Sequence, residues 1–79
     1  MYRAYQVARG MKITKQVVEK WLRTAAKYGW SSHIGGVKYW GTRRYYTNRD
    51  LGYKEAQQIR DLGYNATIDK YGELKVGRK

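Results

Sequence analysis

Two adjacent doublets, Arg43-Arg44 and Tyr45-Tyr46, combine cations and aromatic rings at a spacing that suits binding chemistry. In a strand, residues two positions apart share a face, so each arginine lies with the tyrosine two positions later. Whichever pair turns inward, the other pair presents one cation and one ring on the exposed face. A guanidinium can hold a phosphate while a neighbouring ring stacks on a base. The alternative interpretation is a solvated edge strand whose charges prevent aggregation.

Lys38 and Trp40 extend this candidate site, because they lie an even number of positions from Arg44 and share its face of the strand. A core position is the alternative for Trp40 in a domain this small. We expect Trp21 and Trp30 to be core residues. The inward arginine must carry its guanidinium to an edge, which predicts a bulge or fraying in this strand.

A second candidate surface is a basic stripe, Lys20, Arg23 and Lys27, whose spacing places the three side chains along one side of a helix. Such a stripe can lie against a phosphate backbone. The alternative is an ordinary solvated helix face, in which Glu19 and Arg23 form an ion pair four residues apart.

Residues for catalysis or metal binding are scarce. The chain has no Cys and a single histidine, His33, so a metal site lacks a ligand set. The six Asp and Glu residues are scattered, without a pair for acid–base work. Ser32 and His33 are adjacent, and adjacent strand residues point to opposite faces, so they make a poor nucleophile–base pair. No glycine-rich phosphate loop is present. The sequence predicts a non-enzymatic protein without a metal or cofactor.

The charge balance points to the class of partner. Seventeen Lys and Arg against six Asp and Glu give the 79-residue chain a formal charge of +11, and it also carries nine Tyr and three Trp. A field of this sign concentrates anionic partners, and rings interleaved with cations suit nucleic acid. The sequence therefore predicts a partner that is either a nucleic acid or an acidic protein surface.

The length fits one small domain, which we expect over residues 1–76, followed by a basic tail at 77–79. The start of the chain has no apolar run typical of a signal peptide, and no stretch approaches the ~20 apolar residues of a membrane span. We therefore expect no membrane partner and a cytoplasmic location, in a host cell if the protein is viral.

Hydrophobic periodicity and turn residues predict the elements that position these side chains. They are a strand at 2–9, a helix from Thr14 to a glycine cap at Gly29, a strand at 30–34, a Gly35-Gly36 hairpin, a strand at 37–47, a helix that starts between 48 and 52 and ends at Gly63, a strand at 64–69 and a short last strand around 74–76. This β-α-β-β-α-β order with a short extra C-terminal strand, and with identities repeated 34 residues apart such as Gly29 and Gly63, predicts an α+β ferredoxin-like split βαβ sandwich. Both helices are expected on one face of an antiparallel sheet. A strand edge can also pair two copies of the chain.

The second half resembles the end of a SPOR domain, on the segment from Tyr45 to Tyr64 with Ala56, Ile59 and Gly63-Tyr64. Tyr5-Gln6-Val7 resembles the first strand of that family. The resemblance implies a βαββαβ fold and binding of septal peptidoglycan glycan outside the cytoplasmic membrane.

Three functions follow from these observations. The first is a nucleic-acid-binding protein that uses Arg and Lys on phosphates and rings on the open sheet face. The second is a small interaction protein, such as a phage-encoded inhibitor, that binds an acidic surface of a host complex. The third is SPOR-like glycan binding.

Overall fold

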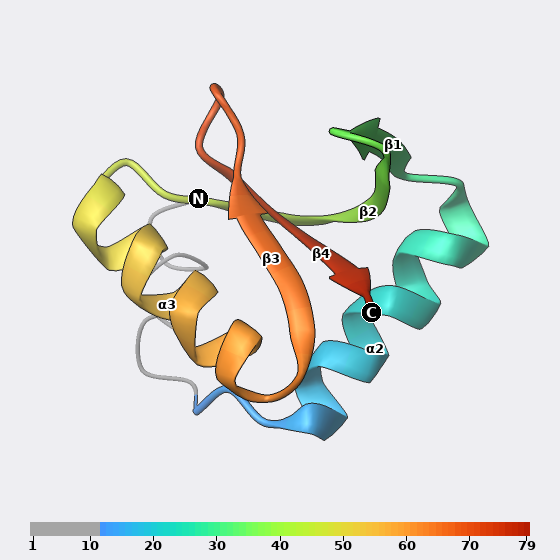
Figure 1. Cartoon of the computed structure of the whole chain (residues 1–79), viewed down its shortest axis with the longest axis horizontal. Coiled ribbons are helices and arrows are strands. Elements are labelled where there is room, and N and C mark those ends of the chain that lie inside the picture. The colour runs from blue at the N-terminus through green and yellow to red at the C-terminus, as the bar shows by residue number, and fades with distance from the viewer. Residues whose placement is uncertain (1–11) are drawn as a thin grey trace.

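The computed structural model describes residues 12–79, and Figure 1 shows their arrangement. The elements in chain order are α2 (Lys15–Tyr28), β1 (Ser31–Ile34), β2 (Val37–Tyr45), α3 (Arg49–Asp61), β3 (Tyr64–Ile68) and β4 (Glu73–Arg78). The α+β class is confirmed, with the order αββαββ over this part of the chain. The strand expected at 2–9 lies outside the described residues.

Helix α2 forms where the helical spacing of its apolar residues and its two capping residues predict it. The Thr14 hydroxyl accepts a hydrogen bond from the backbone N–H of Val17, and the buried side chains Val18 and Leu22 recur one turn apart. Gly29 ends the helix at φ 73°, a left-handed conformation that glycine adopts without strain. The predicted start and end of this helix are confirmed.

Helix α3 begins after Asn48, whose side-chain oxygen accepts from the N–H of Leu51. Asp50 in the first turn is favourable beside the positive end of the helix dipole. Ala56 and Ile59 are buried, as their helical spacing predicts. The start of the helix falls within the expected range 48–52.

The sheet has the strand order β1-β2-β4-β3, and every neighbouring pair is antiparallel. Strands β2 and β3 therefore run parallel to each other, with α3 joining them and β4 inserted between them. This is a split βαβ unit. The expected order needs a correction, because the last strand is central to the sheet rather than a short addition. Gly77 and Arg78, expected in a basic tail, lie within β4.

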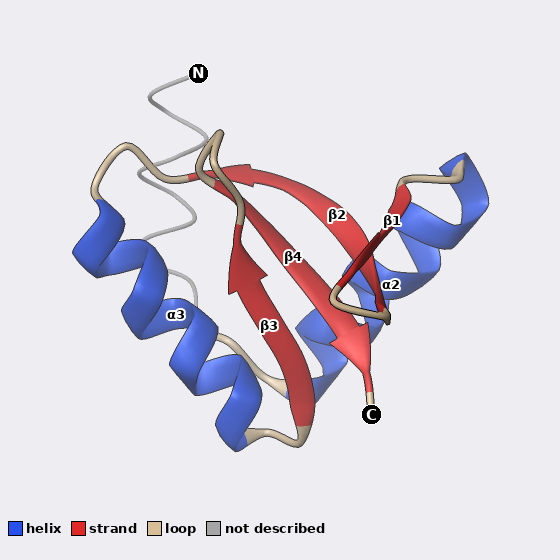
Figure 2. Ribbon diagram, turned by 45° about the horizontal axis from the view of Figure 1, so that its top comes forward, coloured by secondary structure: helices blue, strands red, loops and turns tan. Residues whose placement is uncertain are grey.

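Both helices pack on the same face of the sheet, as expected. One core cluster joins Leu22 of α2, Ile59 of α3, and Leu74 and Val76 of β4. In Figure 2, α3 lies along β3 while α2 passes behind the β1–β2 hairpin. The tight turn of that hairpin is Gly35-Gly36, at φ 59° and 83°, as predicted. None of the described elements covers the opposite sheet face, which we call the open face.

Candidate nucleic-acid interface

Strand β2 divides the two doublets between the two sides of the sheet. Tyr46 is buried in the core cluster and Arg44 is nearly buried, whereas Arg43 is exposed and Tyr45 is 47% exposed. Trp40 pairs with Val76, so it lies on the helix side and packs against the core. The structure thus brings one Arg and one Tyr of the doublets to the exposed side, as expected. Trp40 lies on the same side as Arg44 and Tyr46, but the helices cover this side, so Trp40 does not extend the exposed pair.

A bulge interrupts the strand at the doublets. The register between β2 and β4 shifts between Gly41 and Tyr45, and Arg43 has φ 62°. The Arg43 N–H donates to the Glu73 carboxylate at 3.0 Å, and the Thr42 hydroxyl donates to the carbonyl of Leu74 at 2.8 Å. The predicted bulge is confirmed, and it is fixed by side-chain hydrogen bonds.

Arg44 does not extend to an edge, contrary to expectation. Its side chain is 10% exposed, and its Nη2 donates to Glu55 Oε1 at 3.0 Å. Its guanidinium lies 4.6 Å from the ring centroid of Trp21, and the Tyr46 hydroxyl also donates to Glu55. The partner is Glu55, a buried carboxylate on α3 that the sequence analysis did not identify. Arg44 and Tyr46 therefore hold α3 to β2 in the interior.

The open face carries charges of both signs that compensate one another. Lys75 lies 3.8 Å from the Asp69 carboxylate and donates to the Ser32 hydroxyl at 3.3 Å. Glu73 accepts from the Arg43 backbone, as described above. The sheet surface therefore does not concentrate positive charge in the way that the sequence led us to expect.

Three exposed cations line one side of α2. Lys20, Arg23 and Lys27 are all exposed, and within residues 12–79 none of the three takes part in an ion pair. We call these three residues the α2 stripe. The ion pair considered between Glu19 and Arg23 is not formed, because Glu19 pairs with Arg78 at 2.8 Å instead. No salt bridge within residues 12–79 therefore neutralises the positive charge of the stripe.

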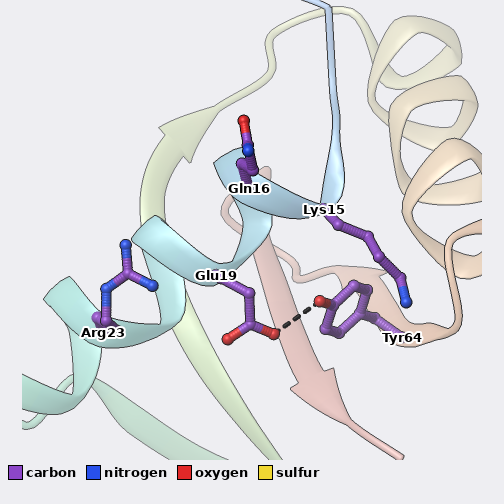
Figure 3. Close-up of a pocket in the computed structure, with 5 residues that line it drawn as sticks. All are labelled: Lys15, Gln16, Glu19, Arg23 and Tyr64. Carbon is purple, nitrogen blue, oxygen red and sulfur yellow. Dashed lines mark hydrogen bonds between the residues drawn. The ribbon is translucent and has the colours of Figure 1, made fainter.

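A shallow pocket of about 470 Å³ lies beside the start of the stripe, lined by Lys15, Gln16, Glu19, Arg23 and Tyr64. Figure 3 shows the Tyr64 hydroxyl directed at Glu19, to which it donates at 2.6 Å. The hydrogen bonds from Arg78 and then from Tyr64 hold the pKa of the Glu19 carboxyl below its usual range. The same bond raises the pKa of Tyr64. The carboxylate therefore stays ionised and ties α2 to β3 and β4.

A cluster of rings and cations stands at the other end of the stripe. The rings of Tyr28 and Trp30 stack at 5.1 Å with an interplanar angle of 18°. The Arg43 guanidinium lies 4.2 Å from the Trp30 ring centroid, and Lys27 Nζ lies 5.7 Å from that of Tyr28. We call these four residues the Tyr28–Trp30 cluster. Lys27 belongs to both groups and joins them into one surface.

Trp30 is only partly buried and lies outside the core cluster, which corrects the expectation that it is core. Its N–H donates to the carbonyl of Ala25 at 2.9 Å, and its carbonyl accepts from Gly41 at 2.8 Å. The left-handed turn at Gly29 sits between the two aromatic residues and brings their rings together. An aromatic on each side of a capping glycine is the sequence signal that could have identified this pair.

The remaining expected site residue, Lys38, is exposed, and its Nζ lies 4.3 Å from the Trp40 ring centroid. It lies in the β1–β2 hairpin, opposite His33. Within residues 12–79, no three His, Cys, Asp or Glu side chains are grouped to hold a metal ion. Neither helix of this part of the chain has the length and apolarity needed to cross a membrane.

In comparisons with known proteins, no family model, no curated protein and no solved structure matches this chain.

Proposed function

We propose that this protein binds nucleic acid without catalysing a reaction, through the α2 stripe and the Tyr28–Trp30 cluster. The observation that carries the proposal is the row of exposed cations on α2, which have no ion-pair partners among the described residues and lead into stacked rings. Arg43 adds a cation from β2 to the same end of the surface. The proposed binding surface thus lies on a helix and its C-terminal turn rather than on the sheet.

The length of the stripe supports this proposal. Lys20 and Lys27 are seven residues apart, which corresponds to about 10 Å along a helix. Successive phosphates of one DNA strand rise by about 3.4 Å along the duplex axis. The stripe is therefore long enough to lie beside several phosphates. The formal charge of +11 adds long-range attraction for any polyanion.

The test is a binding titration of the triple variant Lys20→Gln, Arg23→Gln, Lys27→Gln against single- and double-stranded DNA and RNA at several salt concentrations. We expect weaker binding and a log–log salt slope smaller by about 2 to 3, because each lost phosphate contact removes about 0.7 to 0.9 from the slope. The matched control is Lys54→Gln, Lys70→Gln, Lys79→Gln, which removes the same charge from exposed positions elsewhere.

The control triple variant should keep most of the salt slope of the wild-type protein. Equal losses in the two triple variants would show that net charge, not this surface, governs binding. Wild-type binding that is insensitive to salt would contradict the proposal. A partner retained from nuclease-treated lysate, together with no binding to any of the four nucleic acids, would favour an acidic protein surface instead.

A further inference from the structure

We propose that the exposed ring of Tyr28, backed by Trp30, is a stacking site for an unpaired nucleobase, so that this protein prefers single-stranded to duplex nucleic acid. The inference rests on the proposed function and specifies its ligand. Tyr28 is 60% exposed, although it is the last residue of a well-packed helix. A ring left this open is available to a partner.

The two rings are held in place before any ligand arrives. The backbone of Trp30 is bonded on one side to α2, through Ala25, and on the other to β2, through Gly41. The Trp30 ring contacts two groups: its centroid lies 5.1 Å from that of Tyr28 and 4.2 Å from the Arg43 guanidinium. Because the platform is already ordered, a base that stacks on it loses little affinity to ordering of the protein.

The surroundings of the platform select its occupant. Lys27 beside Tyr28, and Arg43 beside Trp30, place a cation next to each ring, where the phosphates that flank a stacked base would lie. In a duplex the base faces are already stacked on one another, so only phosphates and groove edges remain for the rings and cations. An unpaired base offers a free π-face, and a flat ring accepts any of the bases.

Exposure alone does not make such a platform. Tyr71 is 73% exposed and also has a lysine beside it, with Lys70 Nζ at 5.1 Å from its ring centroid. Within residues 12–79, however, no second pair of rings stacks as Tyr28 and Trp30 do. Tyr71 is therefore a matched control: an exposed tyrosine beside a lysine, but without a backing ring.

The experiment compares Tyr28→Ala, Tyr28→Phe and Tyr71→Ala in titrations with a labelled single-stranded oligonucleotide and with a duplex of the same length, at one salt concentration and for both DNA and RNA. We expect Tyr28→Ala to weaken single-strand binding by about 5- to 150-fold, the range for losing one stacked base. Duplex binding should change by less than about 2-fold. Tyr28→Phe keeps the ring and should bind like the wild-type protein, as should Tyr71→Ala.

Single-strand binding that is unchanged in Tyr28→Ala, while the α2-stripe triple variant loses affinity, would overturn the stacking inference and leave the proposed function standing. Equal losses on single strand and duplex would also overturn it. A wild-type protein that binds neither single strand nor duplex would contradict both the stacking inference and the proposed function. Because Tyr28 is exposed and outside the core cluster, all three variants should fold, which circular dichroism checks.

Discussion

At the scale of single residues, Arg43 combines a strained backbone with an exposed cation. Its φ of 62° is a left-handed conformation that costs a residue with a side chain about 1 kcal/mol more than glycine. The guanidinium reaches Trp30 because the bulge turns this residue toward it. The conformation is therefore tied to the proposed binding surface.

A comparison of Arg43→Gly with Arg43→Ala separates these two roles. Both variants lose the cation, so both should weaken nucleic-acid binding to the same extent. Only glycine relieves the backbone, so Arg43→Gly should be more stable than Arg43→Ala by about 1 kcal/mol. Urea unfolding measures the free-energy difference. Equal stability of the two variants would contradict the backbone strain at Arg43. Variants that bind as tightly as the wild-type protein would contradict the role of the guanidinium.

Glu55 is the residue whose loss should matter most for stability. It is 5% exposed and accepts hydrogen bonds from both Arg44 and Tyr46. Glu55→Ala leaves a nearly buried guanidinium without this counter-charge, and we expect it to lower the free energy of unfolding by about 3 kcal/mol. Asp61→Ala, an exposed carboxylate on the same helix, should change it by less than about 0.5 kcal/mol. Similar losses of unfolding free energy in the two variants would show that the buried Arg44–Glu55 pair stabilises the protein no more than an exposed carboxylate does.

At the scale of elements, α2 is tied to the sheet edge and to the central strand through one carboxylate. Glu19 accepts from Tyr64 of β3 and from Arg78 of β4. Its pKa is lowered in the folded protein, so the stabilisation is fully present above the ordinary value of 4.5 and is lost as the pH falls through the folded value. The tether should therefore weaken in acid.

Glu19→Gln tests this tether, with Asp61→Asn as the control on α3. We expect the melting temperature of the wild-type protein to fall as the pH is lowered below about 4.5, and Glu19→Gln to show a smaller fall, because glutamine has no proton to gain. The control should follow the wild-type curve. Thermal unfolding at a series of pH values measures the difference. An acid sensitivity of Glu19→Gln equal to that of the wild-type protein would exclude this carboxylate as a cause.

The helices were the most predictable elements because their signals are local. Thr14 and Gly29 bracket α2 in the sequence, and each acts on backbone groups within four residues of itself. The Gly35-Gly36 turn is local in the same sense. Strand partners are not local, and the sequence contains no comparable signal for the central place of β4.

At the scale of the whole molecule, the distribution of charge moves the proposed binding surface from the open face of the sheet to α2. The six carboxylates are few, yet those at Asp69 and Glu73 lie toward the open face, where they offset Lys75 and hold the Arg43 backbone. On α2, none of Lys20, Arg23 and Lys27 forms a salt bridge within residues 12–79, although Arg23 lies near Glu19. A polyanion is therefore expected to meet the helix rather than the sheet.

The edges of the described sheet are β1 and β3, and pairing of two chains through one of them stays a prediction. Sedimentation equilibrium would show whether dimers form. SPOR-like glycan binding also stays a prediction, and sedimentation with purified peptidoglycan is its direct test.

The sequence by itself determined the α+β class of the fold, both ends of α2, the start of α3 and the hairpin turn, because each depends on neighbouring residues. The tertiary structure alone decided which Arg–Tyr pair faces the helices. It turns Arg44 and Tyr46 inward, where both donate to the buried carboxylate of Glu55. It also decided that Trp30 stands beside Tyr28 and Arg43. These contacts join residues far apart in the chain, and hydrophobic periodicity within one segment carries no information about a partner supplied by another.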